Sequence, residues 1–297
     1  MRVLEFNDVY RAYQRGSDVL RGITFLLETG EVVGLLGKNG AGKTTLIRVA
    51  IGMIEAQKGS ARVFGLDPRA NALEIKRRVG YVSEDQVLPE FLSVGEVIRL
   101  HRGLFPTWDE GLERRLRERF ALSPKSKIKT LSKGQARQVA LLCAVAHRPE
   151  LLLLDEPAGG LDPSARREFL ETSIQLLNEA GTTILFSSHY MTDVERMASR
   201  IVMIHEGRLL LDNNLDDLRE KFTLVMVSNA AEDRRARLRG AAGCLSVRDQ
   251  GDALHAIFAL EPERCRCVVE KDLGIQNPYC TPIALEDMFI ELVGGRS

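Results

Sequence analysis

The chain has 297 residues, of which 44% are hydrophobic and 28% are charged, and its 41 basic and 41 acidic side chains leave no formal net charge. This composition is typical of a globular protein and excludes disordered and collagen-like chains, and the lack of a basic excess gives no support to nucleic acid as the main partner. At about 150 residues per domain, the length predicts two domains or one large domain with an appendage.

Apolar runs and cysteines predict the compartment. The longest apolar run, 139–146, falls far short of the roughly 20 residues that cross a bilayer, and the first residues lack the apolar segment of a signal peptide. The cysteines are odd in number and widely spaced, and Cys265 with Cys267 fits neither a redox motif nor a zinc motif. We therefore expect reduced thiols and a cytoplasmic protein.

The opening elements predict the first unit of a wound α/β sheet. Strands are expected over 3–10 and 23–27, on either side of a polar turn at 14–18. A short apolar run over 31–36 then enters a glycine-rich turn, which is followed by a helical pattern over 43–51. Strand, glycine loop and helix in this order are typical of α/β proteins.

After a further strand at 78–82, the pattern turns helical and predicts an insert over about 88–148. Three helix starts in the insert carry capping boxes, in which a Ser or Thr side chain and a Glu or Gln three residues later satisfy free backbone amides. The three pairs are Ser93 with Glu96, Thr107 with Glu110, and Ser132 with Gln135.

The α/β pattern returns after the insert and continues to a predicted domain boundary near residue 220. Buried strands are expected over 151–154, 182–186 and 201–204, with a helix over 164–178.

A second, smaller domain is expected beyond the boundary. Strands are predicted over 222–227 and 253–260. Thr281 and Pro282 are predicted to open a final helix over 283–293, because this pair suits the cap and the first turn of a helix.

Residues 37–44, Gly-Lys-Asn-Gly-Ala-Gly-Lys-Thr, fit the phosphate-loop motif G-x-x-x-x-G-K-[ST] in full. The glycines let backbone amides close around phosphate oxygens, and the helix start adds the positive end of its dipole. Lys43 is expected to reach the β- and γ-phosphates, and the Thr44 hydroxyl is expected to bind Mg²⁺. The strand–loop–helix context disfavours the alternative of an accidental glycine turn. The predicted nucleotide contacts are Gly37, Asn39, Gly40, Ala41, Gly42, Lys43, Thr44 and Thr45.

A leucine run over 151–154 ends in Asp155 and Glu156, which places two carboxylates at the rim of the predicted sheet. Alone, two acids after such a run are more often a solvated strand end. Together with the glycine loop they indicate a Walker B element, in which Asp155 holds Mg²⁺ and Glu156 polarises the water that attacks the γ-phosphate.

The segment 131–135, Leu-Ser-Lys-Gly-Gln, is a helix start that on its own indicates only a good cap. Considered together with the two preceding motifs, this segment resembles the Leu-Ser-Gly-Gly-Gln signature of the ATP-binding cassette (ABC) family, with Lys133 in place of the first glycine. The resemblance implies that Ser132, Gly134 and Gln135 of one subunit complete the ATP site of another, so that ATP drives dimerisation.

The resemblance extends to three further elements. Residues 159–162 resemble the D-loop, which implies a nucleotide-site role for Asp162, and His189 after Ser187 and Ser188 resembles the switch histidine. Tyr13 lies where the family places an aromatic residue that stacks on adenine, with Tyr10 as a nearby rival. Without the resemblance, a histidine after a strand is more often a surface residue.

One position departs from the family pattern. The glutamine that the family carries after a short strand falls here at Glu84, and the nearest glutamine, Gln86, comes two residues later. Glu84 is expected to approach Mg²⁺ or a partner, and a register shift that brings Gln86 into the family role is the alternative.

The resemblance implies an α/β fold, with a P-loop ATPase core of mixed sheet and helical insert over 1–220 and a small α+β accessory domain over 221–297. It implies an ATPase with ATP and Mg²⁺ as cofactors, Glu156 and His189 as catalytic residues, and Thr44, Asp155 and Glu84 at the metal. The expected partners are a separate membrane-spanning permease, docked near 84–105, and a second ATPase subunit, identical or paralogous.

The stretch 284–289 is similar to tails of bacterial exporter ATPases, so the chain is expected to power export from the cytoplasmic face of the cell membrane. Two alternatives are a cassette ATPase that acts on ribosomes or DNA and a nucleotide-sensing regulator. A single ATPase half without a heptad arm disfavours the former, and Glu156 with His189 disfavours the latter. No feature of the sequence identifies the transported cargo.

Overall fold

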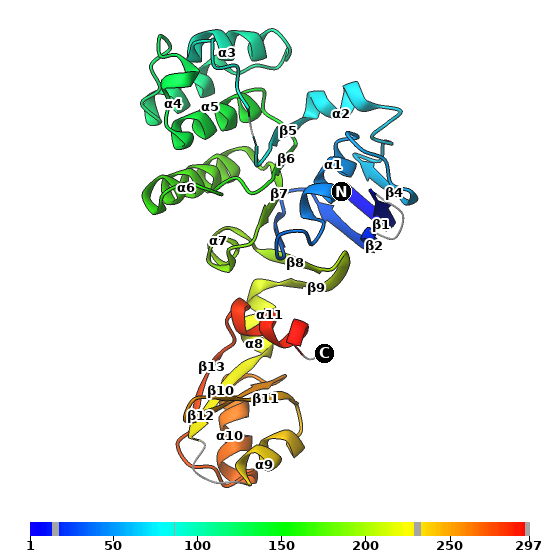
Figure 1. Cartoon of the computed structure of the whole chain (residues 1–297), viewed down its shortest axis with the longest axis vertical. Helices are drawn as coiled ribbons and strands as arrows, with labels where there is room; N and C mark the ends of the chain where they lie inside the picture. Colours follow the sequence, from blue (N-terminus) through cyan, green and yellow to red (C-terminus); the bar gives the residue numbers. More distant parts are fainter. Residues whose placement is uncertain (14–17, 86, 229–232, 295–297) are drawn as a thin grey trace. The chain divides into compact units, whose positions relative to one another are not determined.

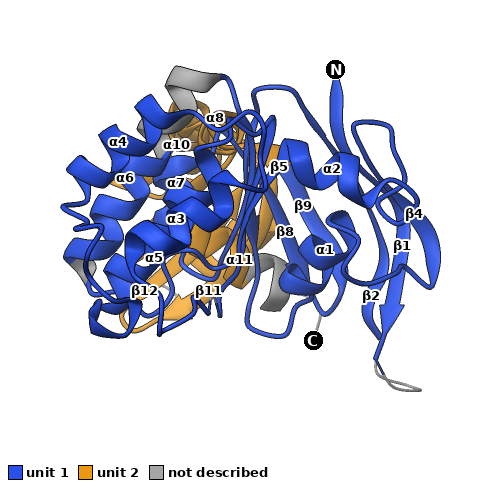
Figure 2. Ribbon diagram, turned by 90° about the horizontal axis from the view of Figure 1, so that it is seen from above, with its two compact units in different colours: residues 1–212 blue, residues 213–297 orange. Residues whose placement is uncertain are grey.

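The computed structural model describes residues 1–13, 18–85, 87–228 and 233–294 (Figure 1). It divides the chain into two compact units, Met1–Asp212 and Asn213–Ser297 (Figure 2). The sequence pattern predicts the boundary near residue 220, within the helix α8 (Leu215–Lys221), whereas the whole of this helix lies in the second unit. Most of the predicted turn at 14–18, and Gln86, fall outside the described residues.

A six-stranded sheet in the order β5-β6-β7-β3-β8-β9 forms the centre of the first unit. Its strands are β3 (Val32–Leu36), β5 (Val79–Val82), β6 (Leu151–Leu154), β7 (Thr183–Ser188), β8 (Arg200–His205) and β9 (Arg208–Asn214). From β5 to β8 the strands pair in parallel, and every residue of β6 and β7 is buried, which explains the apolar runs at Leu151–Leu154 and 184–186. The segments that follow β3, β6 and β7 therefore meet at one edge of the sheet.

A three-stranded antiparallel sheet, β2-β1-β4, completes the mixed α/β core. It is formed by β1 (Arg2–Ala12), β2 (Asp18–Glu28) and β4 (Lys58–Val63). The helix α1 (Lys43–Ala50) shares one hydrophobic core with both sheets, and its Leu46 and Ile47 are fully buried. This packing fixes the start of α1 at the end of β3. The helices α2 (Ala72–Arg78), α6 (Pro163–Ala180) and α7 (Met191–Met197) complete the core.

The predicted helical insert contains α3 (Val94–Arg102), α4 (Glu110–Arg119), a short 3₁₀ turn (Ile128–Thr130) and α5 (Lys133–Val145). The capping boxes at Ser93 and Ser132 are confirmed, since each hydroxyl accepts from the backbone amide three residues later and each partner side chain accepts in return. The third is wrong. Asp109 caps α4 by accepting from the Leu112 amide at 2.8 Å, while the Thr107 hydroxyl donates to the His147 carbonyl at 2.9 Å.

The second unit is an antiparallel four-stranded sheet in the order β11-β12-β10-β13. Its elements are α8, β10 (Thr223–Ser228), α9 (Arg234–Gly240), β11 (Cys244–Gln250), β12 (Ala253–Phe258), α10 (Pro262–Cys267), a π-helical turn (Val268–Asp272), β13 (Tyr279–Pro282) and α11 (Leu285–Gly294). The succession from β10 to β13 is the split βαβ arrangement of ferredoxin-like folds. Val225, Phe258, Cys265 and Val269 belong to a core that the sheet shares with α10 and the following turn.

The predicted start of the last helix is wrong. Thr281 and Pro282 lie in β13, where they pair with Leu224 and Thr223 of β10, and α11 begins at Leu285. Pro282 is tolerated because it ends an edge strand, where the missing amide breaks no ladder of hydrogen bonds. Among the described residues, no helix combines the length and the apolar character needed to cross a bilayer.

Candidate functional site

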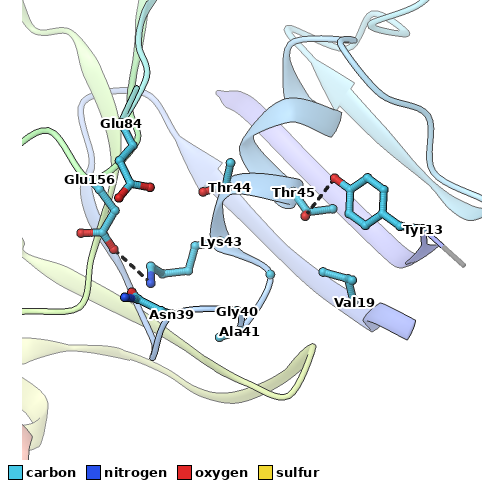
Figure 3. A pocket seen from close by; sticks show the side chains of 11 residues that line it. Tyr13, Val19, Asn39, Gly40, Ala41, Lys43, Thr44, Thr45, Glu84 and Glu156 are labelled. Carbon is cyan, nitrogen blue, oxygen red and sulfur yellow. Dashed lines mark hydrogen bonds and ion pairs between the residues drawn. The ribbon is translucent and has the colours of Figure 1, made fainter. Parts of the chain in front are cut away.

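A pocket of about 470 Å³ opens at the edge of the sheet where β3 and β6 end (Figure 3). The predicted site residues Tyr13, Asn39, Gly40, Ala41, Gly42, Lys43, Thr44, Thr45, Glu84 and Glu156 line it, together with Val19. Residues far apart in the sequence thus share one cavity, because the topology brings the loop after β3, the end of β6 and the β1–β2 region together.

The glycine loop presents backbone rather than side chains. Gly40 and Gly42 have φ values of 82° and 107°, in the left-handed region that favours glycine. A Cβ atom on Gly42 would lie 2.8 Å from the Val19 carbonyl oxygen, so a larger residue does not fit. No side chain caps the start of α1, and its first amides therefore remain available to an anion.

Lys43, the first residue of α1, extends along this loop. Its Nζ donates to the Gly37 carbonyl at 2.6 Å and to the Lys38 carbonyl at 3.3 Å, and lies 3.0 Å from Glu156 Oε1. Side-chain exposure is only 5% for Lys43 and 6% for Glu156, and Figure 3 shows the two groups pointing toward one another. A positive charge is thus held within the loop, where a phosphate would need it.

Glu156 has a second partner and an unusual backbone. Its Oε2 lies 2.8 Å from Nδ1 of His189, which follows β7, and its φ is 45°, a left-handed value for a residue other than glycine. The Glu156 amide donates to Ser187 Oγ at 2.8 Å. A carboxylate between an ammonium and an imidazole is suited to orient and deprotonate a water molecule.

Asp155 and Thr44 form an oxygen-rich corner beside the pocket. The Thr44 hydroxyl donates to Asp155 Oδ1 at 3.0 Å, and the Ser187 hydroxyl donates to the same oxygen at 2.8 Å. Burial raises the pKa of Asp155, and the hydrogen bonds from Ser187 and Thr44 oppose this rise. Hydroxyl and carboxylate oxygens are the donor types that Mg²⁺ prefers, so the residues present fit this cation.

The structure separates the two tyrosine candidates. Tyr13 lines the pocket, half exposed, with its hydroxyl 3.3 Å from Thr45 Oγ1 (Figure 3). Tyr10 is absent from the lining and lies under the Lys58 ammonium, 5.9 Å from the ring centre. Glu84 reaches the pocket from the loop after β5 as an exposed residue, and Gln86 lies outside the described residues.

Five predicted nucleotide contacts do not line this pocket: Gly37, at the start of the glycine loop, and Ser132, Gly134, Gln135 and Asp162. Ser132 is exposed at the start of α5, and a Cβ atom on Gly134 would lie 3.3 Å from the Cβ atom of Ala165 on α6. Asp162 caps α6 by accepting from the backbone amides of Ser164 and Ala165, each at 3.0 Å. The signature segment and the D-loop candidate are therefore neighbours, but the chain alone does not bring them to the pocket.

Sequence reasoning missed a group of residues around His189. The Tyr190 ring lies 3.9 Å from that of His189, and the Arg166 guanidinium lies 3.6 Å above Tyr190 and is paired with Asp193. Because Arg166 is on α6 and its partners are on or beside α7, no local sequence pattern predicts the contacts of Arg166 with Tyr190 and Asp193. Val19 was missed for the same reason, as an apolar strand residue without a motif.

A second pocket, of about 300 Å³, lies between the helical insert and the core, close to the predicted partner groove at 84–105. Its lining is mainly apolar and includes Tyr81, Leu88, Leu104 and Phe105. The ring of His147 stacks on Phe105 at 3.9 Å, and burial lowers the pKa of this histidine to about 4. His147 is therefore neutral at pH 7, and Lys76 adds a positive charge to the otherwise mainly apolar lining.

Comparisons with known proteins give consistent matches. Residues 20–159 match the family described as ABC transporter. The chain is 27% identical to the ABC transporter ATP-binding protein YtrB of Bacillus subtilis, over 95% of each chain. It is 30% identical to the Nod factor export ATP-binding protein I of Rhizobium etli, over 99% of this chain and 94% of the relative. A solved structure of an ATP-binding subunit of an ABC transporter covers 73% of this chain and 92% of its own, with a TM-score of 0.66 and 33% identity.

Proposed function

The chain belongs to the ABC transporter family, and we infer from this membership that it binds and hydrolyses ATP as the subunit that powers a membrane transporter. The observation that carries the inference is the pocket in which the glycine loop, Lys43 and Glu156 meet. A cradle of amides, a buried ammonium and a carboxylate are what phosphoryl transfer to water requires.

Within this pocket each residue receives a role from its position. The amides of 40–44 and the Lys43 ammonium would hold the phosphates, and Tyr13 would stack on the adenine ring. Glu156 would accept a proton from the attacking water, and His189 would orient that carboxylate through the contact between Nδ1 and Oε2. Nucleotide entry must release Lys43 from Glu156, which frees both groups at once.

We propose that Mg²⁺ is held by Thr44 and Asp155, with Glu84 close by. When bound, the cation would supply neutralisation of negative charge on the phosphate oxygens. The buried Asp155 carboxylate, already hydrogen bonded to the Thr44 hydroxyl, supports this assignment. Glu84 is exposed on the pocket wall, where its carboxylate would repel phosphate unless a cation compensates.

A second ATPase subunit would complete the site. Ser132, Gly134, Gln135 and Asp162 lie outside the pocket of their own chain and on an accessible part of the insert and the D-loop candidate. We propose that they meet the nucleotide bound to the other subunit. A homodimer with two equal sites is the simplest arrangement, since one chain carries both sets of residues, and a paralogous subunit is the alternative.

The membrane partner is proposed to be a separate permease that docks in the apolar groove between the insert and the core, from the cytoplasmic face of the cell membrane. The groove adjoins the loop of Glu84, so an occupant would lie next to the nucleotide pocket. The Rhizobium relative, which spans nearly the whole chain, is named for export, and this supports export as the direction. The second unit, shared over that same alignment, would be an accessory domain.

Two measurements test the function. The first is ATP hydrolysis by the purified full chain, and the second identifies the proteins that co-purify with the chain in detergent. We expect Mg²⁺-dependent ATP hydrolysis, lost in Glu156→Gln, and co-purification of a polytopic membrane protein. Absence of hydrolysis from the folded chain and its captured complex would overturn the proposal. Capture of ribosomes or DNA in place of a membrane protein would favour a different class of cassette ATPase.

A further inference from the structure

Arg137 joins three main-chain segments that surround the candidate site. It lies on α5, five residues after Ser132, and its guanidinium is half-buried. Nη1 donates to the carbonyl oxygens of Glu156 and Pro157, each at 3.0 Å, and Nη2 donates to the carbonyl oxygen of Glu84 at 2.7 Å. One side chain thus ties α5 to the segment after β6 and to the loop after β5.

The first of these carbonyls belongs to the residue with the strained backbone. A φ of 45° is disfavoured for glutamate and persists only where surrounding contacts determine it. The Glu156 amide donates to Ser187 Oγ at 2.8 Å, and its carbonyl accepts from Arg137 Nη1 and from the Gly159 amide, each at 3.0 Å. The amide is therefore anchored from β7, and the carbonyl is anchored from the insert and from the turn that follows Glu156.

The backbone conformation sets the direction of the carboxylate. With this backbone, Oε1 of Glu156 lies 3.0 Å from Lys43 Nζ, and Oε2 lies 2.8 Å from His189 Nδ1. Relaxation to an ordinary φ would swing the side chain away from one or both partners. A general base that is misplaced by about 1 Å loses much of its effect, since catalysis depends on held geometry.

We propose that Arg137 is a positioning residue, which holds the left-handed backbone of Glu156 and links it to the loop of Glu84 and to the helix that begins at Ser132. The inference rests on the proposed ATPase function and adds to it a residue outside the recognised motifs. Contacts made at the start of α5 or in the loop of Glu84 would reach Glu156 through this guanidinium.

The chemistry of arginine suits this task. Its planar fork of five N–H groups serves three carbonyls at once, whereas a lysine ammonium lacks that fixed geometry. Burial lowers the pKa of the Arg137 guanidinium, and the carboxylates of Glu84, Asp85 and Glu156 oppose this shift. An arginine keeps its charge under such conditions, so the link does not depend on pH in the physiological range.

The test compares Arg137→Ala and Arg137→Lys with Arg114→Ala, which removes an exposed arginine from α4 of the same insert. We expect Arg137→Ala to lower kcat for ATP by about tenfold to a hundredfold while KM and nucleotide affinity change by less than about twofold. Arg137→Lys should recover part of the loss, and Arg114→Ala should match the wild type.

A double variant separates positioning from a general loss of stability. If Arg137 acts through Glu156, adding Arg137→Ala to Glu156→Gln should slow the residual single-turnover rate by no more than about twofold, because the base is already removed. Equal losses in both backgrounds, or a wild-type kcat in Arg137→Ala, would overturn the inference. If circular dichroism shows that Arg137→Ala does not fold, the same comparisons are made with Arg137→Lys. Wild-type turnover in Arg137→Lys would then overturn the inference. A wild-type chain without ATPase activity would instead refute the proposed function.

Discussion

The ammonium of Lys43 and the carboxylate of Glu156 form a buried ion pair, with Nζ and Oε1 3.0 Å apart. A bound γ-phosphate would compete with Glu156 for this lysine, so the pair opposes nucleotide entry. We expect Glu156→Gln to tighten ATP binding by about threefold to tenfold, because a neutral amide competes less strongly than a carboxylate for the lysine ammonium. Titration with a fluorescent ATP analogue in a Ser132→Arg background would exclude a contribution from dimerisation.

The matched control for this prediction is Glu150→Gln, at the opposite end of β6, which loses the same charge without contact to Lys43. Unchanged affinity in Glu156→Gln would show that the ion pair does not compete with nucleotide.

Lys43→Ala should abolish productive ATP binding. The ammonium is the buried positive charge that the pocket presents to the phosphates, and its loss should raise the Kd for ATP by about a hundredfold or more. Isothermal titration calorimetry with Mg²⁺ and ATP measures this, with Lys125→Ala as an exposed control. Near-normal affinity and turnover would remove the phosphate-loop assignment.

Tyr13→Ala should weaken ATP binding by about tenfold, since stacking on a base is worth roughly 1–3 kcal/mol. Tyr13→Phe keeps the ring and loses only the hydroxyl near Thr45, and should therefore bind ATP almost as well as the wild type. Tyr10→Ala is the matched control, because Tyr10 lies outside the pocket lining. Should Tyr10→Ala be the weakened variant, the adenine assignment belongs to that residue.

Ser132→Arg should block the ATP-dependent dimer, because it places bulk and charge where the opposing nucleotide must approach. The substitution also removes the cap of α5, which is worth about 1 kcal/mol of stability. Thermal unfolding of Ser132→Ala measures that cap loss separately. Size-exclusion chromatography with ATP in the Glu156→Gln background should give dimer for the parent and monomer for Ser132→Arg, and equal dimer in both would exclude the signature role.

Glu84→Gln should leave ATP binding nearly intact while it changes Mg²⁺ dependence or stimulation by the membrane partner. Glu84→Lys should impair both more severely, because it reverses a charge on the pocket wall. Mg²⁺ titrations and partner-stimulated ATPase are to be compared with Gln86→Ala. If Gln86→Ala loses ATPase activity while Glu84→Gln behaves as the wild type, the family role belongs to Gln86.

Much of the first unit follows from the sequence because its signals are local. The glycine loop is contiguous, and the buried strands β6 and β7 are visible as apolar runs. The capping boxes at Ser93 and Ser132 lie within four residues and are confirmed. The error at Thr107 has a physical reason, since Asp109 is a stronger capping residue and is additionally held by Arg148.

The contacts that shape the site could not be predicted from the sequence. Arg137 meets Glu84 and Glu156 across long sequence separations, and Ser187 joins Asp155 to the Glu156 amide from a neighbouring strand. Nothing in the local pattern marks such partners, because they depend on which strands are adjacent. The strand role of Thr281 likewise depends on pairing with Leu224 and not on its own neighbours.

The position of β3 between β7 and β8 has a consequence for synthesis on the ribosome. β3 carries the glycine loop at its end, yet both strands that pair with it are encoded far downstream, at Thr183–Ser188 and Arg200–His205. Until those strands emerge, the nascent β3 has two unpaired apolar edges and its loop has no rigid support. A nascent chain arrested before β8 should therefore be a client of chaperones and a poor nucleotide binder, and binding should arise in a single late step when the sheet closes around β3.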